Sequence, residues 1–305
     1  MKLSQLQQTD RRQRRSTLYL RCALAAPLLL ACLSSTAQAQ AGSSQVAPSA
    51  SSQLTLEQLE IERERLRLRS SAAEERRDAL MRLGAMKRAD SARAAAAGLG
   101  DSAAIVRVTA VRAILSLPAD EAAALLIPLL RDRDEFVRQE TAYALGETGS
   151  PSGVAPLVAV LQKDKQSGPR GAAAVALGQI RDESALIPLT GALSRRLAAS
   201  GLLNRIRRAK TEENEFVRRA AARSLGQIGS RAAVPVLIAV VLDERAPDDV
   251  RRESARSLGS IADPSAVQAL RSLLTARDPY LSRIAYEALL RIAPAEAARP
   301  STPGR

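Results

Sequence analysis

Residues 214–230 read NEFVRRAAARSLGQIGS and supply the repeating unit of this chain. The unit recurs, with substitutions, as DEFVRQETAYALGETGS from Asp134 and as PDDVRRESARSLGSIAD from Pro247. A looser copy, SGPRGAAAVALGQIRD, begins at Ser167. A fixed period reflects one supersecondary unit copied along the chain, so the period has to be established before any local structure is predicted.

One arginine in each copy sets a common register. It stands at Arg76, Arg107, Arg138, Arg170, Arg218 and Arg251, and Ser282 takes its place in the last copy. The spacings are 31, 31, 32, 48, 33 and 31 residues. The single long spacing predicts an insertion of roughly 16 residues within 195–215, and insertions in repeat proteins usually map to a loop or a lengthened helix on one face.

Apolar residues recur one residue before this arginine and three, seven and ten residues after it. In the copy quoted first the larger ones are Val217, Leu225 and Ile228. These offsets follow a helical period and predict one buried stripe. Gly149 and Gly229 stand where such helices should end in a left-handed residue. Glycines eight residues after the arginine predict a close approach of the next helix: Gly84, Gly146, Gly178, Gly226 and Gly259.

Apolar segments between these helices, such as AAVPVLIAVVLD from Ala232, predict a second helix in each repeat. The chain is therefore expected to be all-α, an α-solenoid of about seven helical-hairpin repeats. The sequence contains no alternating run of β-branched residues that would predict a strand.

The pattern V-R-x-x-A-A-x-x-L-G-x-I-G, followed by A-V/I-P-x-L, resembles the short HEAT-like repeat named after phycobilisome lyases, over about Glu74 to Pro294. This resemblance implies a right-handed superhelix with a concave face lined by the second helices. It also implies a structural Asp/Arg ladder, with acids at Asp134-Glu135, Glu215 and Asp248-Asp249. It implies little about function, because such repeats serve as scaffolds in unrelated settings.

The chain has no histidine, which excludes Ser/His/Asp and Cys/His nucleophile pairs and histidine-based zinc and iron sites. The deoxyhypusine hydroxylases, whose repeats are similar, hold iron with His-Glu pairs and are excluded for the same reason. We therefore predict no enzyme, no cofactor and no metal. Acid–base chemistry by Asp, Glu or Lys stays open until buried carboxylates are located.

Residues 1–39 have the three parts of an export signal. An arginine-rich start precedes the apolar segment Cys22–Leu33, and Ala37-Gln38-Ala39 forms an A-x-A cleavage site with Gln40 following. Two variants stay open. Leu29-Leu30-Ala31-Cys32 resembles a lipobox, which would make Cys32 a lipidated N-terminus, and Arg14-Arg15 could belong to a twin-arginine signal. We expect a periplasmic or secreted protein or, with Cys32 lipidated, a membrane-anchored lipoprotein.

Residues 40–53 then form a flexible linker, 54–294 the solenoid, and 295–305 a disordered tail. Thr55–Gln58 and Ser71–Glu74 have the spacing of capping boxes. The helix that follows Thr55, as far as Arg69, is either a terminal cap that shields the core or a docking segment.

A basic cluster is the one candidate site. On two adjacent repeats, positions facing away from the buried stripe hold Arg219, Arg223, Arg252 and Arg256, with Arg283 beside them. The insertion adds Arg205, Arg207 and Arg208. Such a patch suits an acidic protein surface, an anionic polymer or a phosphate-bearing lipid, although a solvated basic face with no partner fits the same residues.

Nucleic acid is not expected, although the formal net charge is +13. Single-strand readers stack bases on aromatic side chains, and in the sequence Phe136, Tyr143 and Phe216 do not cluster with the arginines. We predict a non-enzymatic scaffold for protein–protein interaction in the bacterial envelope. The alternatives are an accessory lyase-type enzyme and a lipid-anchored envelope-assembly factor, with the oligomeric state undetermined.

Overall fold

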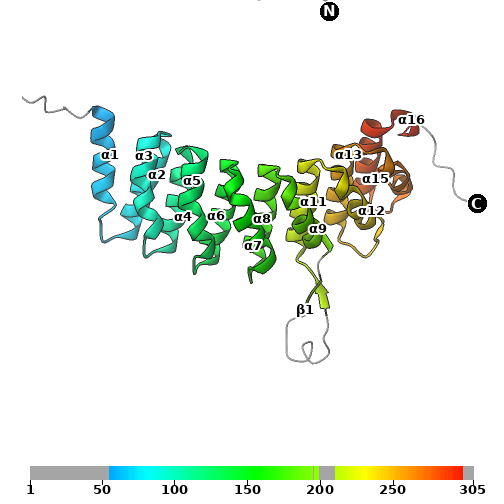
Figure 1. Cartoon of the computed structure of the whole chain (residues 1–305), viewed down its shortest axis with the longest axis horizontal. Helices are drawn as coiled ribbons and strands as arrows, with labels where there is room; N and C mark the ends of the chain where they lie inside the picture. Colours follow the sequence, from blue (N-terminus) through cyan, green and yellow to red (C-terminus); the bar gives the residue numbers. More distant parts are fainter. Residues whose placement is uncertain (1–54, 195, 199–209, 298–305) are drawn as a thin grey trace, which may run out of the picture. The chain divides into compact units, whose positions relative to one another are not determined.

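The computed structural model describes residues 55–194, 196–198 and 210–297 (Figure 1). All of them belong to one compact unit, Gln53–Arg305. The predicted export signal with Cys32, the linker, and Arg205, Arg207 and Arg208 of the insertion lie outside the described residues, as does the tail from residue 298.

Seven helical pairs make up the described part of the chain. The second helix of each pair carries the repeated arginine or its replacement: α2 (Ala73–Ala85), α4 (Ala104–Ala113), α6 (Glu135–Thr148), α8 (Ser167–Ile180), α11 (Glu215–Ile228), α13 (Asp248–Ile261) and α15 (Pro279–Ile292). The first helices are α1 (Leu56–Arg67), α3 (Ala89–Ala95), α5 (Ala119–Leu126), α7 (Val154–Lys163), α9 (Leu186–Ser194), α12 (Val234–Leu242) and α14 (Val267–Ser272). A short helix, α16 (Pro294–Ala297), follows α15.

The second helices form a continuous layer, because each one packs against the next from α2 to α15 (Figure 1). Their predicted stripe is buried, as Val217 and Leu225 illustrate with no exposed surface. The predicted α-solenoid is therefore confirmed. Its helix ends are also as expected, since Gly149 and Gly229 close α6 and α11 in the left-handed conformation, with φ of 67° and 77°.

The repeated glycines mark where neighbouring second helices come closest. A Cβ added to Gly146 would lie 2.6 Å from the Cα of Ala176 and 2.8 Å from its Cβ. Gly226 would meet the Cβ of Ser257 at 2.7 Å in the same way. Ser257 also ties two repeats together, because its hydroxyl donates to the carbonyl of Ala222 over 2.8 Å. Glycine at this offset is thus a packing requirement between repeats.

α1 packs against α2 and α3 as the first helix of the first repeat. Thr55 and Gln58 form the predicted capping box, whereas the box predicted at Ser71–Glu74 is wrong, because α2 starts after Ala72 without a side-chain cap. The outer face of α1 keeps apolar residues exposed: Leu56, Leu59 and Leu66.

The repeated arginines form an arginine–carboxylate ladder along the loops. Arg76 donates to the carboxylate of Asp101 through Nε and Nη2, over 2.6 and 2.8 Å, while its Nη1 donates to the carbonyl oxygens of Ser70 and Ser71. Arg107, Arg138 and Arg170 repeat this arrangement with Asp132, Asp164 and Glu213. The hydrogen bond from Arg76 holds the pKa of Asp101 below its ordinary value, so this carboxylate is ionised at neutral pH.

The acids of this ladder differ from those expected. The predicted partners were Asp134-Glu135, Glu215 and Asp248-Asp249. Asp134 instead caps α6 by accepting from the amides of Phe136 and Val137. The ladder acids precede the helix by several residues because each must reach back to the arginine of the preceding repeat. The resemblance to a family predicts that a ladder exists, but it does not predict which of two nearby acids contacts the arginine of the preceding repeat.

The insertion begins and ends as a short two-stranded ribbon, whose strands the sequence did not predict. β1 (Arg196–Ala198) pairs antiparallel with β2 (Lys210–Glu212), with Leu197 opposite Thr211. α9 and α11 are neighbours, joined by a hydrogen bond from Arg218 Nε to the carbonyl of Leu193 over 3.0 Å. The inserted chain must therefore leave and return at one place, and antiparallel pairing satisfies its backbone there. Within the described helices, none has the length and apolar character to span a membrane.

Candidate binding surface

The four predicted arginines lie around one hollow. This hollow, of about 440 Å³, lies over α11 and α13 and is lined by Val175, Phe216, Arg219, Ala220, Arg223, Asp249, Arg252, Glu253, Arg256 and Tyr280. A second hollow, of about 500 Å³, adjoins it and shares Arg223, Glu253 and Arg256. We call the two together the arginine groove, after its arginines: Arg181, Arg219, Arg223, Arg252, Arg256 and Arg291.

Acidic neighbours hold several of these arginines in place. Arg252 donates to Asp278 over 2.7 Å and to Asp249 over 3.0 Å. Its guanidinium also lies 5.2 Å from the ring centroid of Tyr280, within the range of a cation–π contact. The hydrogen bond from Arg252 lowers the pKa of Asp278 from its ordinary value. Arg252 is thus fixed on three sides and serves as a rigid wall of the groove.

Arg219 and Arg256 are paired more loosely. Arg219 lies 3.4 Å from Asp249, and Arg256 lies 3.3 Å from Glu253, with about half of each arginine side chain exposed. Exposed pairs of this kind contribute about 0–1 kcal/mol, so a stronger partner can displace them. Arg223 is exposed and has no ion pair within the described residues.

Aromatic side chains flank the arginines, which corrects the expectation that the two do not cluster. The Phe216 ring lies directly over Gly171, where an added Cβ would collide with the ring. Tyr280 forms the other wall and is 67% exposed. Both stand two residues before the register position of their repeats, an offset that would have revealed the pattern in the sequence.

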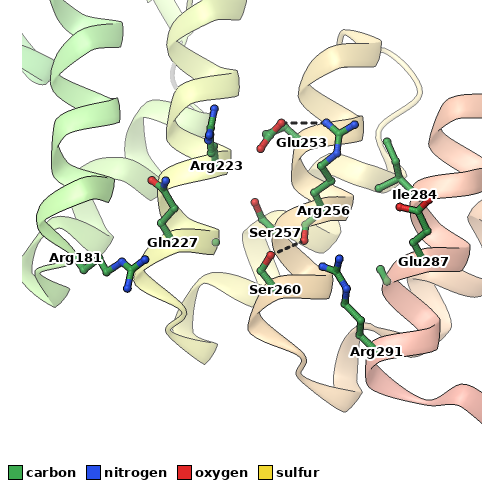
Figure 2. Close-up of a pocket in the computed structure, with 12 residues that line it drawn as sticks. Arg181, Arg223, Gln227, Glu253, Arg256, Ser257, Ser260, Ile284, Glu287 and Arg291 are labelled. Atoms are coloured by element: carbon green, nitrogen blue, oxygen red, sulfur yellow. Dashed lines mark hydrogen bonds and ion pairs between the residues drawn. The ribbon is translucent and has the colours of Figure 1, made fainter. Parts of the chain in front are cut away.

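The second hollow gathers basic residues from four successive repeats (Figure 2). Arg181 follows the end of α8 and Arg291 lies near the end of α15, and both point toward the hollow from opposite sides, with Ser260 between them (Figure 2). Neither arginine has an ion pair within the part of the chain that the structure describes. Gln227 lines the same hollow, and its buried Oε1 has no hydrogen-bond partner there.

Not every predicted residue joins this surface. Arg283 pairs with Glu287 over 2.9 Å and is 78% exposed, but it lines neither hollow. Arg181 and Arg291 were not predicted, because Arg181 stands just after the end of α8 and Arg291 stands at an offset from the register position that the other arginines of the groove do not share. Across residues 55–194, 196–198 and 210–297, no three side chains of the Cys, Asp and Glu types gather as metal ligands would.

Helix pairs that stack in chain order, each packed against its neighbours, are the architecture of α-solenoid proteins. Models of HEAT repeats match residues 124–200, 192–248 and 241–300, which is more than half of the chain. The chain belongs to the HEAT-repeat family, as the sequence pattern predicted. No curated protein matches it.

Several solved structures are similar to this chain. YibA of Escherichia coli is 17% identical, with a TM-score of 0.54, covering 77% of this chain and 81% of that one. The CpcE–CpcF complex of phycocyanin lyase from Nostoc is 22% identical with a TM-score of 0.46, covering 83% and 92%. Human deoxyhypusine hydroxylase is 20% identical with a TM-score of 0.37, covering 76% and 84%. Identities this low support the fold alone.

Proposed function

We propose that this protein is a non-enzymatic scaffold in the bacterial envelope that holds an acidic segment of a partner protein in the arginine groove. The observation that carries the proposal is the convergence of six arginines from adjacent repeats on two adjoining hollows, where Arg181, Arg223 and Arg291 lack ion pairs within the described residues. A partner carboxylate could pair with each of these three arginines.

The mixed charge of the groove favours a protein over a nucleic acid. Three carboxylates, Asp249, Glu253 and Glu287, line the groove among the arginines. They would repel the evenly spaced phosphates of a nucleic acid, whereas a peptide offers backbone N–H donors that carboxylates accept. The aromatic walls, Phe216 and Tyr280, suit an apolar side chain next to the acidic residues of such a segment.

The envelope location rests on residues 1–39 of the sequence. Cleavage after Ala39 leaves Gln40 as the first residue, whereas processing as a lipoprotein leaves Cys32. N-terminal sequencing of the protein purified from envelope fractions therefore separates a soluble exported scaffold from a lipid-anchored one. Detection of Met1 on a cytosolic protein would contradict the proposal of export.

The groove is tested by reversing one unpaired charge. Arg223→Glu should weaken binding of the captured partner at least 10-fold, because it removes an attractive charge and adds a repulsive one in the centre of the groove. The matched control is Arg231→Glu, the same change at an 80% exposed arginine outside both hollows. Crosslinking and affinity measurement in envelope extracts would contradict the proposal if both variants keep the wild-type partner and affinity.

A further inference from the structure

The arginine–carboxylate ladder has four complete arginine–carboxylate pairs, which we call rungs, at Arg76, Arg107, Arg138 and Arg170. In each complete rung the arginine Nε and Nη2 donate to a carboxylate that lies six residues, or in the last case five, before the arginine of the next repeat: Asp101, Asp132, Asp164 and Glu213. Three of these acids share one backbone conformation, with φ between −63° and −57° and ψ between 141° and 148°.

Arg251 occupies the same position in its repeat without a carboxylate partner. Its Nε donates to the carbonyl oxygen of Val241 over 3.1 Å, and no hydrogen bond or ion pair of its Nη atoms is found within the described residues. The residue six before Ser282 is Ala276, where the complete rungs have an acid. Ala276 nevertheless has the ladder backbone, with φ of −60° and ψ of 146°, and its amide donates to Leu273 as the amide of Asp132 donates to Leu129.

A hollow of about 900 Å³ lies beside this incomplete rung. It is lined by Arg251, Arg252 and Arg277, by Thr275 and Ala276, and by the apolar faces of Leu242, Pro279 and Tyr280. Arg252 is already occupied by Asp278. Arg251 therefore lines this hollow with its Nε bonded to Val241 and with Nη atoms that no carboxylate of the described residues pairs with.

We infer that this hollow binds a carboxylate side chain, Asp or Glu, of a partner protein, which supplies in trans the acid that Arg251 lacks. Arg251 would hold it through its free Nη atoms, with Arg277 as a second cation in the same hollow. Glu244 and Asp248 also line the hollow and disfavour polyanions, so the site suits a single carboxylate on an otherwise uncharged segment. The inference goes beyond the arginine groove and does not require it.

Supplying the missing acid in cis tests the inference. Ala276→Asp should pair with Arg251, raise Tm by ~4 °C, and abolish binding of an added carboxylate. Binding is followed by the NMR signal of the Arg251 Nε–H group during titration with sodium acetate, at ionic strength held constant with sodium chloride. The wild-type protein should give a saturable shift that Ala276→Asp removes and that Arg223→Glu leaves unchanged, which separates this site from the arginine groove.

A second probe identifies the source of the carboxylate. The blocked peptide acetyl-Gly-Gly-Asp-Gly-Gly-amide should bind at least ~5-fold more tightly than acetate, because its backbone can also contact Leu242, Pro279 and Tyr280. Equal affinities would overturn the assignment to a protein side chain and leave a site for small carboxylates. An Arg251 signal that shifts no more than that of Arg231, or an Ala276→Asp variant that lowers Tm and keeps the acetate response, would overturn the site itself.

Discussion

Replacing Glu213 with alanine should lower the free energy of unfolding by about 3–5 kcal/mol, the effect of removing one partner from a buried ion pair. The side chain of Glu213 has no exposed surface, and that of Arg170 is 8% exposed. Their oxygens and nitrogens meet at 2.6 and 3.1 Å. The alanine variant leaves the Arg170 charge buried without its carboxylate, and it releases the chain where β2 joins α11. Urea unfolding followed by circular dichroism measures the change.

The matched control for Glu213 is Glu62→Ala, which also removes a glutamate from an arginine pair. Glu62 pairs with Arg65 within α1, and about half of each side chain is exposed. This variant should change the free energy of unfolding by less than about 0.5 kcal/mol, as for other exposed helical pairs. If Glu213→Ala were as mild as Glu62→Ala, the ladder would not stabilise the solenoid at the insertion.

Replacing Gly146 with alanine should destabilise the protein by about 1–3 kcal/mol, because the new methyl group overlaps the backbone of the next repeat. The added Cβ would lie 2.6 Å from the Cα of Ala176, and a helix backbone cannot move away as a flexible side chain can. This loss outweighs the roughly 1 kcal/mol that alanine gains over glycine within a helix. Thermal unfolding of the single variant provides the measurement.

Gly191→Ala is the control for the glycine prediction, because Gly191 lies within α9 and an added Cβ would meet no atom within 4 Å. The same substitution there should stabilise the protein by up to about 1 kcal/mol. Opposite signs for the two variants are the expected result. The same sign at both sites would mean that helix propensity, and not contact between repeats, governs the glycine positions.

The architecture could be predicted from the sequence because the same apolar and glycine positions recur in each repeat. Val217, Leu225 and Gly226 recur at fixed offsets, and a helix is the structure that places these offsets on one packed face. The insertion breaks this redundancy. It occurs once, so no second copy indicates its structure, and the β1–β2 ribbon follows from where α9 and α11 lie in space.

The candidate site was predictable in part. Arg219, Arg223, Arg252 and Arg256 share two offsets on adjacent helices, so the repeat period alone places them together. Arg181 and Arg291 lie at helix ends, and their directions depend on the local backbone, which is left-handed at Arg181 with φ of 61°. The aromatic wall at Phe216 depends on the absence of a side chain at Gly171, in a different repeat. A pattern within one repeat cannot predict contacts between two repeats that differ in sequence. Those contacts are the part of the candidate site that the sequence left unpredicted.

The arginine groove and the hollow at Arg251 adjoin, since Arg252 and Tyr280 line both the groove and that hollow. An extended partner segment that crosses Tyr280 could therefore contact both. The two sites differ in chemistry. The groove has several cations and aromatic walls, whereas the hollow has the guanidinium of Arg251 without a carboxylate partner. Tyr280 is thus a wall shared by the first hollow of the groove and the hollow at Arg251.

Site-specific photocrosslinking in living cells tests the central claim most directly. A photoreactive benzoylphenylalanine would replace Tyr280 in one strain and Phe136 in another, at equivalent positions of their repeats. The two side chains are similarly exposed, 67% and 65%, but only Tyr280 lines the groove. A scaffold that grips an acidic partner here predicts one acidic protein crosslinked at Tyr280, absent at Phe136 and lost in the Arg223→Glu background. Equal crosslinking at both positions, or crosslinking at Phe136 alone, would contradict the account.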